Sequence, residues 1–303
     1  MHRSSPAMLY AVAFVLVFCA CSDAPTPKVL VIGLDGIHVG VLATTSTPNI
    51  DSLAAAGAFS DAAQTLVRTV SGPGWSSMLI GARSDKHLVT SNELTGHNYA
   101  EYPDFLTRLE RINPAYNTFA VLDWPPLATT ASGGPIISDA VDVKLFFDGS
   151  VDGYGWADST SVAAAVEHLL NEDPDAAFVY IGAVDEVAHA TSTHGPEYRA
   201  ALELADAYVG ALAAAVRRRP TYIDEDWLIL ISTDHGRDER GGHGGDSPGE
   251  RTIFYLASGP STVQGKITET PYIVDVAVTA LTHLGIEIDP EWDLDGKAVG
   301  LRR

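Results

Sequence analysis

Short runs of consecutive apolar residues, separated by segments with helical spacing, restrict the possible folds of this chain more than any other feature. The runs are VLVIGL (29–34), NTFAVL (117–122), AAFVYI (176–181), WLILIS (227–232) and TIFYLAS (252–258). Strands that are apolar at nearly every position are typical of a parallel sheet that is covered on both faces. The sequence therefore predicts an α/β fold, with a mostly parallel central sheet and helices on both faces.

Helical segments fill the intervals between these runs. TPNIDSLAAAG (47–57) begins with a turn signal and stops at a glycine, and SGPGWSSMLIGA (71–82) places a proline in a first helical turn. Residues 158–175 and 197–219 also have helical spacing, and the second of these segments ends in basic residues. The chain has 303 residues, which suits one large globular domain or a domain with an inserted cap.

The N-terminus has the pattern of an export signal. Arg3 precedes the apolar run MLYAVAFVLVFCAC, which is too short for a comfortable membrane span and typical of a signal-peptide core. Ala20, Cys21 and Ser22 are similar to a bacterial lipoprotein cleavage site, and an ordinary signal peptide cut nearby is the alternative. We expect a signal peptide at 1–20, a Pro-rich tether at 21–28 and an extracytoplasmic protein. Its lipid anchor would be at Cys21, facing the periplasm or the cell surface.

The charge of the chain excludes one class of partner and raises a question about another. The formal net charge is −20, so a basic nucleic-acid-binding surface is not expected. If the substrate is an anion, something other than surface lysines must supply positive charge at its binding site.

Three aspartates follow three of the apolar runs. Asp35 follows VLVIGL, Asp185 follows FVYIGAV and Asp234 follows LILIST. Any one of them alone would be read as a turn or helix-cap residue. In a parallel sheet, however, the carboxyl ends of the strands meet at one edge, where ligands bind. Three carboxylates there would repel one another unless a cation lay between them.

Histidines accompany these aspartates. His189 lies four residues after Asp185, so both would project from one helix face, although a solvated helix pair is the alternative. His235 follows Asp234 directly, and His243 lies in the flexible segment GGHGG. Mixed Asp and His ligands favour zinc, and less often manganese or iron. Three aspartates and three histidines suit two divalent ions, which could clamp both oxygens of an in-line displacement.

The order of these motifs resembles the alkaline phosphatase superfamily, and most closely its nucleotide pyrophosphatase/phosphodiesterase branch. The matching pieces are GLDG, TPNIDSLAAAG, VSGPGWSSMLIGARSDKHLVTSNE, DEVAHA, STDHG, GGHGGDSPGERTIFYLASGP and DVAVTALTHLGI. The resemblance implies two zinc sites. One would use Asp185, His189 and His243, and the other would use Asp35, Asp234, His235 and the oxygen of the nucleophile.

The family nucleophile is a Thr or Ser two residues before a proline, which corresponds to Ser71 here. A hydroxyl beside zinc is activated, and a helix N-terminus offers N–H groups to a phosphoryl oxygen. The alternatives are that Ser71 is only a helix cap, or that Thr69 is the nucleophile. Asn92 resembles the family asparagine that donates to a phosphate oxygen, and would otherwise be read as a turn residue.

Some positions depart from the family pattern. Leu88 stands where the family has glycine after histidine, and the interval between His235 and His243 lacks the insertion of many relatives. We therefore expect a single hydrolase domain at 29–303, in which residues 93–160 supply any small cap. Trp75 occupies the place of an arginine in the sulfatase motif, which makes a sulfatase the more distant alternative.

Together these features predict a metal-dependent phosphoric ester hydrolase that acts on a small-molecule phosphodiester through a Ser71 intermediate. A phosphomonoesterase is the first alternative, and a non-catalytic surface lipoprotein is the alternative from another class. The sequence does not indicate the oligomeric state, and the lipid anchor is the only membrane contact that it predicts.

Overall fold

One sheet of eight strands forms the centre of the computed structural model, which describes residue 2 and residues 24–302. The strands are β1 (Thr26–Leu34), β2 (Ala58–Gln64), β3 (Thr118–Leu122), β4 (Val143–Phe146), β5 (Ala176–Ile181), β6 (Glu225–Ser232), β7 (Thr252–Ser258) and β8 (Gly265–Lys266). Their order is β4-β3-β5-β1-β6-β7-β2-β8, and β7 alone among them runs antiparallel to its neighbours. The predicted mostly parallel α/β fold is confirmed.

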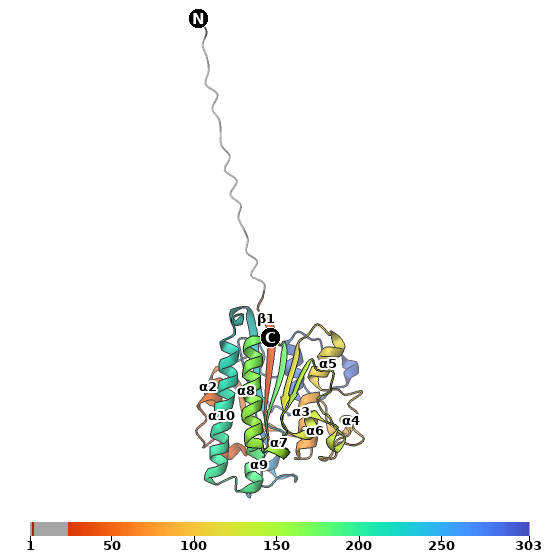
Figure 1. The fold of residues 1–303 in the computed structure, drawn as a ribbon, viewed down its shortest axis with the longest axis vertical. Helices are drawn as coiled ribbons and strands as arrows, with labels where there is room; N and C mark the ends of the chain where they lie inside the picture. Colours follow the sequence, from red (N-terminus) through yellow and green to blue (C-terminus); the bar gives the residue numbers. More distant parts are fainter. Residues whose placement is uncertain (1, 3–23, 303) are drawn as a thin grey trace.

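Helices cover both faces of this sheet (Figure 1). One face carries α2 (Pro48–Ala56), α8 (Tyr154–Asn171), α9 (Ala183–Ala190) and α10 (Pro196–Arg217), and the other carries α3 (Ser71–Ile80), α5 (Phe105–Ile112) and α12 (Asp275–His283). The shorter helices are α1 (Val39–Leu42), α4 (Ser84–His87), α6 (Pro125–Ala128), α7 (Gly149–Asp152) and α11 (Pro248–Arg251), with 3-10 turns at Ala131–Gly133, Tyr222–Asp224 and Pro290–Trp292.

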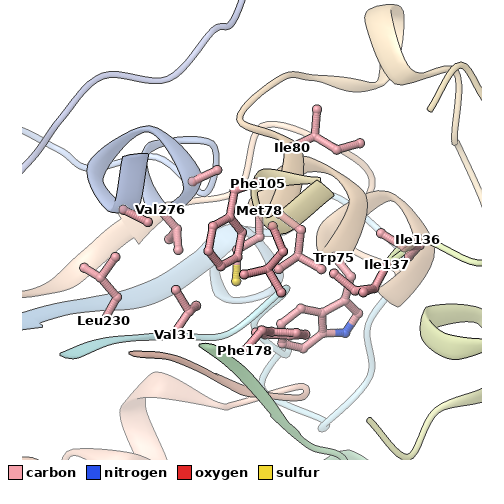
Figure 2. Close-up of a cluster of buried hydrophobic side chains, with 14 of the residues drawn as sticks. Val31, Trp75, Met78, Ile80, Phe105, Ile136, Ile137, Phe178, Leu230 and Val276 are labelled. Atoms are coloured by element: carbon pink, nitrogen blue, oxygen red, sulfur yellow. The ribbon is translucent and has the colours of Figure 1, made fainter. Parts of the chain in front are cut away.

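The central strand β1 shows why its sequence is apolar throughout. Val29 and Val31 belong to the core under α3, α5 and α12, whereas Leu30 and Ile32 belong to the core under α8 and α10. Successive side chains of a strand point to opposite faces, so a strand covered on both faces needs apolar residues at every position. Figure 2 shows the first of these cores, where Val31 lies near the aromatic rings that α3, α5 and β5 contribute.

Two of the predicted boundaries differ from the structure. The last residues of the expected tether, Thr26 to Lys28, already pair in the sheet with Glu225 to Trp227 of β6. The expected cap at 93–160 contributes β3 and β4 to the central sheet, so it is largely built into the domain. The predicted signal peptide at 1–20 and Cys21 lie outside the described residues. Within residues 24–302, no helix is long and apolar enough to cross a membrane.

Candidate active site

Three neighbouring strands bring the three predicted aspartates to one edge of the sheet. β5, β1 and β6 lie side by side and run parallel. Asp35 directly follows β1, and Asp234 lies two residues beyond the end of β6. Asp185 lies in the first turn of α9, which begins after β5. The spacing of four residues on this helix places His189 Nε2 3.1 Å from Asp185 Oδ2.

The two buried aspartates beside His235 each have one oxygen held and one oxygen free. Trp75 Nε1 and the Tyr180 hydroxyl donate to Asp35 Oδ2 over 3.0 and 2.5 Å. Gly36 N donates to Asp234 Oδ1 over 3.1 Å. Among the described residues, Asp35 Oδ1 and Asp234 Oδ2 have no hydrogen-bond partner although both atoms are buried. Each carboxylate is therefore fixed in orientation, and its second oxygen is left to accept a further hydrogen bond or to bind a cation.

Backbone carbonyl oxygens orient two of the histidines. His243 Nδ1 lies 2.9 Å from the Thr69 carbonyl oxygen, and His235 Nδ1 lies 3.0 Å from the Gly236 carbonyl oxygen. A carbonyl oxygen only accepts, so each Nδ1 carries the proton and each Nε2 of the neutral ring has a lone pair. This is the tautomer that binds a metal through Nε2.

The free atoms of these side chains face one another. His235 Nε2 lies 3.4 Å from Asp234 Oδ2 and 3.7 Å from Asp35 Oδ1, and His243 Nε2 lies 3.0 Å from His189 Nε2. Asp35 Oδ1, Asp234 Oδ2 and His235 Nε2 are buried without a hydrogen-bond partner in the described part of the chain, and a divalent cation would satisfy them. The donor set therefore fits metal ions.

Two groups of three side chains have ligand atoms within 4.8 Å of one another: Asp185, His189 and His243, and also Asp35, Asp185 and His235. The first group has the composition predicted for one ion. The second contains Asp185, where the prediction had Asp234, and Asp234 lies beside it against His235. The six predicted aspartate and histidine ligands thus lie in one cluster, and the division of the ligands between two ions stays a prediction.

The electrostatics of the cluster disfavour three ionised carboxylates. Burial, followed by the charges of Asp234 and Asp185, raises the pKa of Asp35. Burial and Asp185 raise the pKa of Asp234 to about 7. Burial also acts to raise the pKa of Asp185, but the hydrogen bond with His189 and the positive charge of Arg237 act against it, and this pKa is lowered. A bound cation would favour the ionised forms of all three.

Ser71 and its predicted rival Thr69 have different surroundings. Ser71 begins α3 and lines the cavity of the site, with 7% of its surface exposed. The fully buried Thr69 hydroxyl donates to the Gly245 carbonyl oxygen over 2.8 Å and accepts from Gly244 N over 2.9 Å. Thr69 is therefore engaged in holding the loop of His243, and Ser71 is the hydroxyl that faces the cavity.

Asn92 is held beside Ser71 by its own side chain. Its Oδ1 accepts from Gly72 N over 2.7 Å, so the first N–H of α3 after Ser71 is occupied. The Nδ2 group of Asn92 keeps its two donors for a ligand in the cavity, which Asn92 also lines. Leu88, which departs from the family pattern, has φ 65° in the turn after α4, a conformation that favours glycine.

The cavity at this edge has a volume of about 190 Å³. Its lining combines predicted site residues with residues that sequence reasoning did not assign. It consists of Asp35, Ser71, Asn92, Trp124, Tyr154, Tyr180, Gly182, Asp185, Glu186, His189 and His243. Trp124 and Tyr154 come from the segment expected to form a cap. Asp234 and His235 lie beneath this lining, because both are fully buried.

Sequence reasoning missed the side chains that orient the ligands. Trp75 and Tyr180 hold Asp35, and Arg237 forms an ion pair with Asp185. Tyr180 lies one residue before the end of β5, near the edge of the sheet where the three aspartates lie, which is a signal that could have indicated it. Trp75 and Arg237 carry no comparable signal, because only the packing of distant segments places them beside their partners.

Comparison with known families identifies the chain. Residues 29–240 match the family model described as type I phosphodiesterase / nucleotide pyrophosphatase. The chain belongs to this family. Residues 256–299 also match a domain of unknown function, DUF4983. The resemblance inferred from the motifs is confirmed, and the family match indicates a phosphoric ester hydrolase. Such enzymes are typically metal-dependent, in agreement with the donor set described above.

Solved structures of the same fold extend this result. Murine ectonucleotide pyrophosphatase/phosphodiesterase 5 is 14% identical with a TM-score of 0.67, over 87% of this chain and 96% of that chain. A 2-O GAG sulfatase is 15% identical with a TM-score of 0.67, over 91% of this chain and 73% of that chain. At these identities the likeness establishes the alkaline-phosphatase-like fold.

One curated relative matches a shorter segment. GPI ethanolamine phosphate transferase 3 of Eremothecium gossypii is 31% identical over 100 residues, which are 32% of this chain and 10% of that protein. The match thus spans about a tenth of the length of that relative.

Proposed function

We propose that this protein is a phosphodiesterase that cleaves small-molecule phosphodiesters, with Ser71 as its nucleophile and two divalent cations, zinc by preference, in its site. The observation that carries the proposal is the position of Ser71, at the start of α3 and in the cavity that Asp35, Asp185 and His243 also line. A nucleophilic hydroxyl, a set of metal-type donors and a phosphate-sized cavity are the parts that phosphoryl transfer requires.

The reaction divides into two displacements at phosphorus. Ser71 Oγ loses its proton and forms a bond to phosphorus while the bond to the leaving oxygen breaks, and that oxygen takes up a proton and departs as an alcohol. Water then attacks the phosphoseryl ester, releases the phosphate monoester and returns the proton to Ser71. Asn92 Nδ2 donates to one non-bridging oxygen in both steps, because its Oδ1 is fixed on Gly72 N.

The cations would be held by Asp35, Asp185, His189, Asp234, His235 and His243. When bound, they lower the pKa of the attacking hydroxyl and stabilise negative charge on the phosphoryl and leaving oxygens. The chain itself prepares their ligands. Burial lowers the pKa of His243 to about 4, which keeps its ring neutral, and the Thr69 carbonyl oxygen holds its Nδ1 proton.

The cavity lining favours a diester over a monoester. A monoester dianion carries one more negative charge and is best bound by a further positive group. The three nearby basic residues, Arg68, Arg83 and Lys86, do not line the cavity. Lys86 instead pairs with Asp293 and Asp295 at 3.0 Å. With Asn92 as the neutral donor, the site suits a phosphate that carries a single charge.

The test is turnover of bis-p-nitrophenyl phosphate against p-nitrophenyl phosphate by the zinc-loaded protein. We expect kcat/KM for the diester to be higher by about tenfold or more, which corresponds to about 1.4 kcal/mol. A higher kcat/KM for the monoester would contradict the proposal. Arg68→Ala and Lys86→Ala are the matched variants: neither should change the ratio, and a selective loss of monoester turnover would identify the missing positive group.

We propose further that the protein acts outside the cytoplasm, anchored through a lipid on Cys21. The support is the sequence pattern of a short apolar run that ends in Ala20, Cys21 and Ser22. The protein should then fractionate with membranes, and Cys21→Ser should release it. A mature N-terminus beyond residue 21 would contradict the anchor.

A further inference from the structure

A single buried arginine contacts the loops that carry the predicted metal ligands. Arg237 lies two residues after His235, and only 1% of its surface is exposed. Its Nε donates to the Gly36 carbonyl oxygen over 2.9 Å, and its Nη1 donates to the Gly241 carbonyl oxygen over 2.5 Å. Its Nη2 lies 3.3 Å from the Asp185 carbonyl oxygen and also pairs with Asp185 Oδ1.

Each residue that Arg237 contacts is a predicted metal ligand or lies within two residues of one, and the three ligands come from three different segments. Gly36 follows Asp35 after β1, Asp185 is itself a predicted ligand on α9, and Gly241 lies two residues before His243. Arg237 therefore joins, through one rigid group, three segments that are far apart in the sequence. The guanidinium is suited to this because its donors are fixed in one plane, and it stays charged in proteins.

The approach of Asp185 to the loop of Asp35 depends on Gly36. Gly36 has φ +63°, and a Cβ at this position would lie 2.0 Å from Asp185 Oδ1. The glycine thus leaves the space in which the Asp185 carboxylate meets Arg237. Because Arg237 takes Oδ1, the other oxygen, Oδ2, is left facing His189 at 3.1 Å. The orientation of Asp185 is therefore set by Arg237 on one side and by the helical spacing of α9 on the other.

We propose that Arg237 is a positioning residue for both cation sites, an inference that rests on the two-cation site of the proposed function. Asp185 belongs to both groups of converging ligands, so a residue that fixes its carboxylate affects both. The positive charge of Arg237 by itself opposes cation binding. This charge is offset within its ion pair with Asp185. Its loss would free the carboxylate, leave the Gly241 carbonyl oxygen without a donor within residues 24–302, and leave the Gly36 carbonyl oxygen with the Tyr198 hydroxyl alone.

The experiment measures cation binding without using activity. Wild-type protein, Arg237→Met, Arg237→Lys and the control Arg240→Met are stripped with a chelator and titrated with Zn²⁺ by calorimetry. The same proteins are titrated with Co²⁺, whose visible absorption reports ligand geometry. Arg240 is a matched control because it is an exposed arginine in the same loop.

Arg237→Met should bind both ions about tenfold or more weakly and change the Co²⁺ spectrum. Arg237→Lys keeps the charge but has a single donor group, so it should also bind weakly, while Arg240→Met should match the wild type. Wild-type affinity and spectrum in Arg237→Met would overturn the inference. If Arg237→Met does not fold, Arg237→Lys decides, since full restoration by lysine would show that the charge alone suffices.

These results are separable from the proposed function. A wild-type protein that binds two ions but hydrolyses no phosphodiester would contradict the proposed substrate and leave the role of Arg237 intact. A wild-type protein that binds neither ion would overturn the two-cation site and the inference with it.

Discussion

The two ends of strand β6 treat buried charge in opposite ways. At its amino end, Glu225 is 7% exposed and accepts hydrogen bonds from Arg219, Thr221 and Trp227. At its carboxyl end, the fully buried Asp234 has one oxygen with no partner in the described part of the chain. Glu225 is the first residue of β6 and Asp234 lies two residues beyond its last, so the two carboxylates lie at opposite ends of the strand.

The pKa shifts follow this difference. Burial acts to raise the pKa of Glu225, but the bonds and charge of Arg219, with Thr221 and Trp227, lower it to about 2. Burial and Asp185 raise the pKa of Asp234 to about 7. The protein itself supplies the partner at the amino end. At the carboxyl end the protein supplies a donor to one oxygen of Asp234 and none to the other. This unpaired oxygen makes that end of the strand a candidate site for cation binding and catalysis.

The largest expected effect is on catalysis at the carboxyl end. Ser71→Ala removes the attacking oxygen, so kcat/KM for bis-p-nitrophenyl phosphate should fall by about 10³-fold or more. Metal content should remain because the six aspartate and histidine ligands are kept, and circular dichroism should stay unchanged because the Ser71 hydroxyl makes no hydrogen bond within residues 24–302.

Thr69→Val is the matched control for this prediction. The Thr69 hydroxyl holds the loop of His243, so its loss should lower metal affinity more than it lowers kcat at saturating zinc. If Ser71→Ala kept near wild-type turnover while Thr69→Val lost it under saturating zinc, the nucleophile would be Thr69.

Asp234→Asn should separate function from stability. The amide oxygen can still accept from Gly36 N, but the free carboxylate oxygen and its charge are lost. We expect roughly 10²-fold lower turnover and weaker zinc binding. In the protein stripped of metal by a chelator, the free energy of unfolding should stay the same or rise, because the substitution removes a buried charge that no positive group neutralises. If Asp234→Asn stripped of metal were much less stable than the wild type stripped of metal, the Asp234 carboxylate would have a stabilising partner in the metal-free protein.

Glu225→Gln is the converse experiment at the amino end. It removes the charge that compensates the buried Arg219, so the free energy of unfolding should fall by about 3 kcal/mol in urea denaturation. The kcat/KM should be unchanged, because this end is remote from the cavity. A loss of activity without a loss of stability would contradict the division between the two ends.

The same variant changes the response of stability to acid. The folded pKa of Glu225 is below its ordinary value of 4.5, so its stabilising contribution is present above pH 4.5 and is lost as the pH falls toward about 2. Wild-type stability should therefore decrease over this window more steeply than that of Glu225→Gln. Parallel curves from urea denaturation at pH 5, 4 and 3 would show that Glu225 is not responsible.

The sequence predicted those features that depend on local pattern. The apolar runs indicated the parallel sheet, and the aspartates after them indicated which edge holds the candidate site, because the carboxyl ends of the strands meet there whatever the details of packing. The spacing of Asp185 and His189 predicted a shared helix face, which α9 provides. The sheet order and the solved neighbours confirmed the fold, and the family match indicates a phosphoric ester hydrolase.

Features that depend on tertiary packing were not predictable in this way. Trp75 lies on α3 and yet donates to Asp35 after β1, and Arg237 reaches Asp185 on α9. Neither contact has a sequence signal, because the partners are separated by long segments. The strand boundary at Thr26 was also missed, since Pro27 and Lys28 look like a tether until the pairing with β6 is seen.

The smallest expected effect tests whether burial or pairing decides stability at the amino end. Asp173 contacts both Lys28 at 3.0 Å and Arg219 at 2.8 Å, but its side chain is 71% exposed. Exposed ion pairs are weak because water already solvates both charges, so Asp173→Asn should cost about 0.5 kcal/mol. Lys28 and Arg219 keep Asp175 and Glu225 as partners. A loss as large as that of Glu225→Gln in urea denaturation would show that the bridge by Asp173, rather than burial of the Arg219–Glu225 pair, holds this end of the sheet together.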